Sequence, residues 1–149
     1  MSKHPSFRPR LLLIEDDWGR VSIFQRWLEG TEFVLLHVQS GGKALGVLSR
    51  GCEAIAGTML DHDLSDSPLT ETDLSLSTSN VMPLLCRHLP KTAPVLIHSH
   101  NATKPPRMQR ALETAGLSVT RIRFATLAQD EKLFQQWLEE VRDNWEPED

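Results

Sequence analysis

LLLIEDD, residues 11–17, joins a continuous apolar run to three consecutive acids. A short apolar run without polar interruption predicts a strand that is buried on both faces, as in a parallel sheet. The pattern returns twice, because AIAGTML at 54–60 is followed by Asp61 and VLI at 95–97 is followed by His98. Polar groups therefore follow three predicted core strands, at the ends where α/β proteins bind their ligands.

Helical patterns alternate with these strands along the chain. Between Trp18 and Glu29 the apolar residues recur at helical spacing, and Gly30 is a natural stop. Such alternation predicts an α/β fold with a parallel five-stranded sheet between two helical layers. We expect a flavodoxin-like (βα)5 three-layer sandwich with strand order 2-1-3-4-5. The remaining expected strands span 33–38 and 117–124, and the remaining helices span 41–51, 81–89, 106–116 and a last segment opened by a capping box from Thr126 to Gln129.

The composition indicates one ordinary globular domain. The 149 residues are 40% hydrophobic and 24% charged, and the net charge of −4 gives no overall attraction to nucleic acid or anionic membrane. We expect an N-terminal arm at 1–10, a single domain at 11–145 and an acidic tail at 146–149, with no DNA-binding domain. No apolar run approaches a membrane span, and two cysteines without metal spacing favour a reducing compartment, so we expect a cytoplasmic location.

Three polar clusters should meet at one edge of the sheet, because the carboxyl ends of parallel strands share that edge. Clustered carboxylates repel one another unless a cation compensates, and a hard ion such as Mg²⁺ or Mn²⁺ takes oxygen ligands. Alternatively, Asp16 or Asp17 caps the helix that begins at Trp18. The clusters are Glu15, Asp16 and Asp17 after the first strand, Asp61, His62 and Asp63 after the third, and His98, Ser99, His100 and Asn101 at the fourth.

IEDD at 14–17, MLD at 59–61 and a hydroxyl residue at the end of the fourth strand resemble the receiver domain of response regulators. The resemblance covers residues 11 to about 145 and implies that Glu15 and Asp16 bind Mg²⁺ together with Asp61. It also implies that Asp61 accepts a phosphoryl group and that the hydroxyl of Ser99 contacts it. The usual Lys-Pro pair on the fifth strand is missing, which leaves Arg121 or Arg123 as the phosphate-binding cation.

LDHDL at 60–64 and HSHN at 98–101 resemble more closely a divergent branch, the cyclic-phosphate-processing receiver domains. This resemblance implies action on a cyclic phosphate instead of the relay of a phosphoryl signal. Imidazoles beside a metal-bound phosphate are suited to proton transfer near neutral pH. In that case we expect His98 to act as acid or base and Ser99 to contact the phosphate. Asn101 is expected to orient the ligand by a hydrogen bond. Asp63 is expected either to join the metal shell or to orient His62.

Three functions remain open from the sequence. The first is a metal-dependent cyclic phosphodiester hydrolase, whose substrate is a phosphate-containing small molecule or an RNA end. The second is a single-domain response regulator that a histidine kinase phosphorylates on Asp61 and that acts through a target protein. The third is a degenerate receiver without phosphate chemistry, which the dense polar strand ends disfavour. The histidines of HSHN and the missing Lys favour the hydrolase.

Overall fold

The computed structural model of the chain describes residues 8–49, 55–61, 86–99 and 107–145. Five parallel strands form one sheet in the order β2-β1-β3-β4-β5, so the predicted flavodoxin-like order is confirmed. The strands are β1 (Arg10–Ile14), β2 (Val34–Val38), β3 (Ile55–Asp61), β4 (Val95–Ser99) and β5 (Val119–Arg123).

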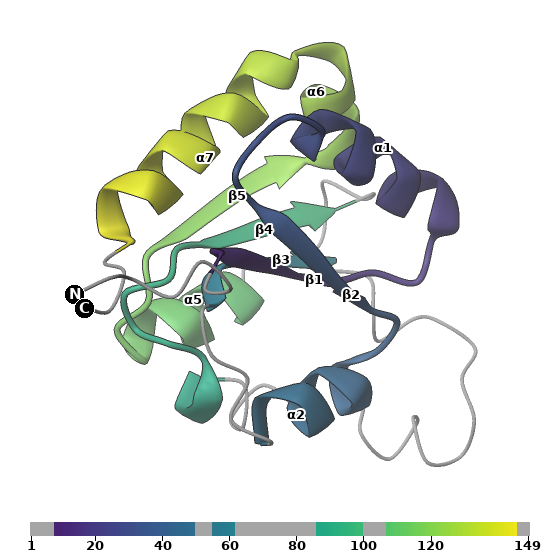
Figure 1. Ribbon diagram of the computed structural model, residues 1–149. Coiled ribbons are helices and arrows are strands. Elements are labelled where there is room, and N and C mark those ends of the chain that lie inside the picture. Colours follow the sequence, from purple (N-terminus) through teal and green to yellow (C-terminus); the bar gives the residue numbers. More distant parts are fainter. Residues whose placement is uncertain (1–7, 50–54, 62–85, 100–106, 146–149) are drawn as a thin grey trace, which may run out of the picture.

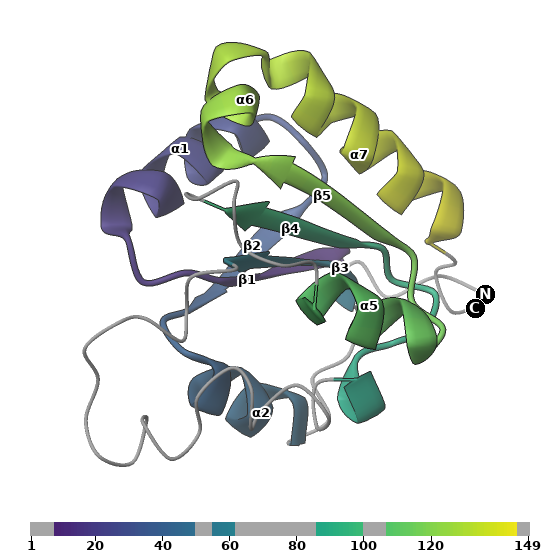
Figure 2. The same cartoon turned by 180° about the vertical axis from the view of Figure 1, so that it is seen from behind.

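Helices cover both faces of the sheet and complete three layers (Figures 1 and 2). One face carries α1 (Trp18–Leu28), α6 (Phe124–Gln129) and α7 (Glu131–Asn144). The other carries α2 (Gly41–Ser49) and α5 (Arg107–Thr114). In the described part of the chain, none of the helices has both the length and the apolarity that a membrane span requires.

The alternation of side chains along each strand divides the core into two clusters. In β1, Leu12 and Ile14 pack toward α2 and α5, whereas Leu11 and Leu13 pack toward α1 and α7. All four are fully buried, which explains why this strand is apolar without interruption. The residue that follows Ile14 therefore belongs, by the same alternation, to the face that α1 covers.

Helix α1 begins and ends where its sequence predicts. The side chain of Asp17 accepts a hydrogen bond from the backbone N–H of Arg20 at 3.1 Å, so Asp17 is the N-cap. The helix ends at Leu28, and Gly30 follows with a φ of +80°. A residue with a side chain adopts this backbone conformation only with strain, so glycine suits the position. The cap fixes the first turn of α1 directly after the strand end, which places Arg20 above the sheet edge.

The C-terminal region differs from the prediction. The capping box from Thr126 to Gln129 is wrong, because these residues lie inside the short helix α6. Helix α7 is instead capped by Asp130, whose carboxylate accepts from the backbone N–H of Lys132 at 3.1 Å. Of the helix predicted at 81–89, residues 86–89 are described, and 86–88 of these are helical. Of the arm predicted at 1–10, residues 8–10 are described and Arg10 is already the first residue of β1. Residues 1–7 and the tail at 146–149 lie outside the described residues.

Gly57 allows α7 to pack closely on the sheet. A Cβ at this position would lie 3.1 Å from side-chain atoms of Leu11, Trp137 and Val141. We expect Gly57→Ala to lower the free energy of unfolding by about 1–3 kcal/mol, since the buried core has to expand. Gly46→Ala is the control: it lies within α2 with no atom near the added Cβ and should gain about 0.5–1 kcal/mol. Urea unfolding measures both, and a neutral Gly57→Ala would contradict this close packing.

Candidate functional site

Three polar side chains at the sheet edge continue the face of the core that α1 covers. Glu15 lies two residues after Leu13, and Asp61 lies two residues after Met59. His98 follows Leu96 in the same way. Side chains two residues apart on a strand share a face, so all three polar groups point to the same side of the sheet. Asp61 and His98 are also direct partners in the β3–β4 register.

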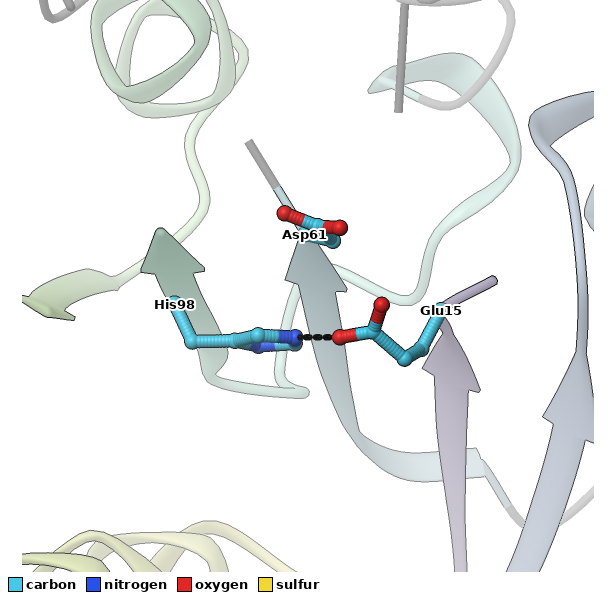
Figure 3. A group of neighbouring side chains, drawn as sticks. All are labelled: Glu15, Asp61 and His98. Carbon is cyan, nitrogen blue, oxygen red and sulfur yellow. Dashed lines mark hydrogen bonds and ion pairs between the residues drawn. The ribbon is translucent and has the colours of Figure 1, made fainter. Parts of the chain in front are cut away.

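Glu15 and His98 reach toward each other across the end of β3, and Asp61 lies between them at the tip of that strand (Figure 3). The ring nitrogen Nε2 of His98 lies 2.7 Å from Oε1 of Glu15. Glu15 and His98 are fully buried and Asp61 is 1% exposed. The His98 ring also packs edge-on against Phe24 at 5.1 Å between ring centroids. A buried imidazole is thus held between an aromatic core and a carboxylate.

Arg20 joins the acids at this edge, and sequence reasoning missed it. Its Nε and Nη2 donate to the two carboxylate oxygens of Glu15 at 2.9 and 3.0 Å. Its Nη2 also donates to Oδ2 of Asp61 at 3.2 Å. The sequence places Arg20 three residues after the N-cap Asp17, on the first turn of α1 and over the strand end, but it does not show which way the side chain turns.

The charges of the site perturb one another. Burial alone would raise the pKa of Glu15, but the hydrogen bonds from His98 and Arg20 outweigh it and hold this pKa well below its usual range. Burial and the neighbouring charge of Glu15 raise the pKa of Asp16. Burial opposes the charge on Arg20, but its bonds to Glu15 and the charge of Asp61 raise its pKa above the usual value. Glu15 and Arg20 therefore form an ion pair at neutral pH.

Glu15, Asp61 and His98 each place one ligand atom within 4.8 Å of the others, a grouping that is compact enough to hold a metal ion. Glu15 is already saturated, however. A carboxylate can accept about four hydrogen bonds. Glu15 accepts four: from Nε2 of His98, from Nε and Nη2 of Arg20, and from the backbone N–H of Asp17 at 3.0 Å. Within this grouping the carboxylate of Asp61 is the other oxygen donor that suits a hard cation. Asp16 is half-buried, and its predicted role as a metal ligand stays a prediction.

The remaining neighbours of Glu15 fix its backbone. The backbone N–H of Glu15 donates to the carbonyl of Val38 at 3.0 Å, and its own carbonyl contacts Nε2 of His37 at 2.7 Å. The indole of Trp18 lies against the His37 ring, with centroids 4.8 Å apart. Sequence reasoning did not assign His37 a role, and the structure shows that it anchors the end of β1.

The other predicted site residues divide into those described and those outside the described residues. Ser99 is the last residue of β4 and pairs in register with Arg123. Arg123 is exposed and Arg121 is half-buried, both on β5. Their predicted role in binding phosphate stays a prediction, as does that of Ser99. His62, Asp63, His100 and Asn101 lie outside the described residues.

Solved structures of similar fold include signal receiver domains. The receiver domain of a sensor histidine kinase from Pseudomonas aeruginosa, with a magnesium ion coordinated in its active-site cleft, has a TM-score of 0.60 and 16% identity over 88% of this chain and 98% of that one. The signal receiver domain of an HD domain-containing protein from Pseudomonas fluorescens has a TM-score of 0.62 and 13% identity over 91% and 98% of the two chains. No protein-family model and no curated protein sequence matches this chain.

The same fold also occurs inside a different kind of protein. A lysine decarboxylase from Francisella novicida matches 97% of this chain with 18% of its own length, a TM-score of 0.62 and 11% identity. At such identities the likeness shows the receiver-like fold, and the function has to be argued from the site.

The pair of Glu15 and Arg20 should stabilise the fold above the usual pKa of a glutamate. At pH 7, in buffer with EDTA, we expect Glu15→Gln to lower the free energy of unfolding by about 3 kcal/mol, because the largely buried guanidinium of Arg20 loses its two-point contact with a carboxylate and keeps only the bond to Asp61. The pKa of Glu15 is lowered in the folded state, so this stabilisation is lost as the pH falls below the usual value of 4.5. Urea unfolding between pH 7 and pH 3 should therefore show that the difference in free energy of unfolding between the wild type and Glu15→Gln becomes smaller as the pH falls.

Glu32→Gln is the matched control for that experiment. Glu32 also pairs with an arginine through two hydrogen bonds, from Nε and Nη2 of Arg142 at 2.7 and 2.9 Å, but its side chain is 49% exposed. An exposed pair contributes less than about 1 kcal/mol. Equal losses in the two variants would contradict a stabilising role for burial of the Glu15 pair.

Proposed function

We propose that this chain is a receiver-like, Mg²⁺- or Mn²⁺-dependent hydrolase of a cyclic phosphodiester. One observation carries the proposal: an imidazole, that of His98, lies inside the acid cluster and bonds to Glu15 beside Asp61. In the described residues Nδ1 of His98 has no hydrogen-bond partner, although it is buried. A buried imidazole beside these carboxylates supports a role in proton transfer in addition to metal binding.

The carboxylates of Asp61 and Asp16 are the proposed metal ligands, and Glu15 stays behind them as the residue that orients His98 and Arg20. When bound, the cation supplies positive charge that offsets these carboxylates and the phosphoryl oxygens of a ligand. Ser99 is the proposed hydroxyl contact to the phosphate, with Arg121 or Arg123 as a further cation.

Opening a cyclic phosphodiester joins a water oxygen to phosphorus and breaks one ester P–O bond. The water loses a proton and the leaving alkoxide gains one, so a group that holds a proton near neutral pH is needed. His98 is the proposed group: its Nε2 contacts Glu15, and in the described residues its Nδ1 has no hydrogen-bond partner. Asn101 orients the ligand, and Asp63 completes the metal shell or orients His62. The substrate is a phosphate-containing small molecule or an RNA end.

One observation favours a second function. Receiver domains are among the solved structures of this fold, including one that belongs to a sensor histidine kinase, and Asp61 lies at the end of β3, where the receiver resemblance places the phosphoryl acceptor. In this alternative a histidine kinase phosphorylates Asp61 and the phosphorylated chain binds a target protein. The bond from Arg20 to Asp61 then supplies the positive charge that the missing Lys does not.

³¹P NMR tests the hydrolase. With Mg²⁺ and a panel of 2′,3′-cyclic nucleotides, the wild-type protein should convert the cyclic resonance to a monoester. Asp61→Asn should abolish conversion and weaken Mg²⁺ binding at least tenfold, because a ligand carboxylate is lost. Asp143→Asn, at an exposed position of α7, is the control and should change neither.

His98→Ala separates the two functions. It should abolish hydrolysis and leave phosphorylation of Asp61 by acetyl phosphate largely intact, because the acceptor needs no imidazole. Full hydrolytic activity in this variant would remove His98 from the mechanism. No hydrolysis by the wild type, together with labelling of Asp61 by acetyl phosphate, would establish the second function instead.

A further inference from the structure

Arg20 lies between the buried acids and the surface. Its side chain is 15% exposed, whereas the side chains of Glu15 and Asp61 are 0% and 1% exposed. The guanidinium is the outermost of these three groups. A ligand that approaches Asp61 from the solvent at this edge therefore meets Arg20 beside it.

The orientation of Arg20 is fixed from several sides. Nε and Nη2 form a two-point contact with Glu15, and Nη2 adds the bond to Asp61. The guanidinium carbon also lies 5.8 Å from the centre of the Phe124 ring, at the start of α6. A guanidinium held by two parallel hydrogen bonds has little rotational freedom left to lose on binding. The residue is preorganised.

Two of the five donors of this guanidinium remain for a ligand. The contacts to Glu15 and Asp61 use the single N–H of Nε and both N–H groups of Nη2. The two N–H groups of Nη1 are the ones that remain. Nη1 lies 4.0 Å from Oδ2 of Asp17, which is beyond hydrogen-bond distance. The side chain of Asp17 is 49% exposed, so the Nη1 end of the guanidinium faces a carboxylate that borders the solvent.

We propose that Arg20 binds the phosphate of the ligand: Nη1 donates to a phosphoryl oxygen while Nε and Nη2 stay on Glu15 and Asp61. The inference rests on the proposed phosphate site and names a residue of it that lies on α1 instead of β5. Arginine is suited to this task because its charge is permanent and its planar donors match phosphate oxygens. Glu15 then serves to orient Arg20.

Phosphate binding separates this role from a purely structural one. The probe is orthophosphate, titrated into the full chain with Mg²⁺ present and followed by calorimetry. Arg20→Met should weaken orthophosphate binding about tenfold or more, since a charge-assisted hydrogen bond is lost. Arg20→Lys keeps the charge but lacks the second amino group, so we expect a loss of about fivefold or more.

Mn²⁺ binding, measured by electron paramagnetic resonance on the same proteins, is the second readout. Removing a positive charge beside the acids should leave Mn²⁺ affinity unchanged or increase it. Arg142→Met is the matched control, because Arg142 makes the same two-point contact with the exposed Glu32. It should bind orthophosphate and Mn²⁺ within twofold of the wild type. If Arg20→Met does not fold, Arg20→Lys gives the result.

The outcomes distinguish this inference from the proposed function. Orthophosphate affinity within twofold of the wild type in folded Arg20→Lys and Arg20→Met overturns the inference, even if cyclic nucleotides are hydrolysed. Loss of orthophosphate binding in both variants supports it, even if no cyclic nucleotide is hydrolysed. A wild-type protein that binds no orthophosphate with Mg²⁺ present overturns both.

Discussion

The carboxylate of Glu15 organises this edge of the protein. It accepts hydrogen bonds from His98 of β4, from Arg20 of α1 and from the backbone N–H of Asp17, the residue that caps this helix. The backbone N–H of Glu15 itself donates to β2. A buried carboxylate is costly unless each of its acceptor positions is used, and here all of them are. The strand ends and the first turn of α1 are thus held in one arrangement by a single ionised group.

Much of this arrangement follows from the sequence. The apolar runs predict the strands, their alternation with helices predicts the parallel order, and parallel strands bring their carboxyl ends together. The position of Glu15, Asp61 and His98 at one edge was therefore predictable. Their common face was also predictable in principle, because each lies two residues after a leucine or methionine of the same core cluster.

The contacts themselves were not predictable. Nothing in the spacing of Arg20 shows whether its long side chain turns toward the sheet or into solvent, since both suit a helix that lies against a strand end. The same holds for His98, which the strand pattern places at the edge without showing that its ring is fully buried. The start of α7 was missed because Asp130 caps as well as a threonine does, and the local sequence offers both.

The saturation of Glu15 affects how variation among homologous chains should be interpreted. A set of residues that is retained because the domain unfolds without it looks the same, in an alignment, as a set retained for catalysis. Under the proposed function, Glu15, Arg20 and His98 are subject to both kinds of selection at once. Asp16 is only half-buried, and selection for folding constrains it less. An acid that persists at position 16 across diverged sequences would therefore be stronger support for retained chemistry than an invariant Glu15.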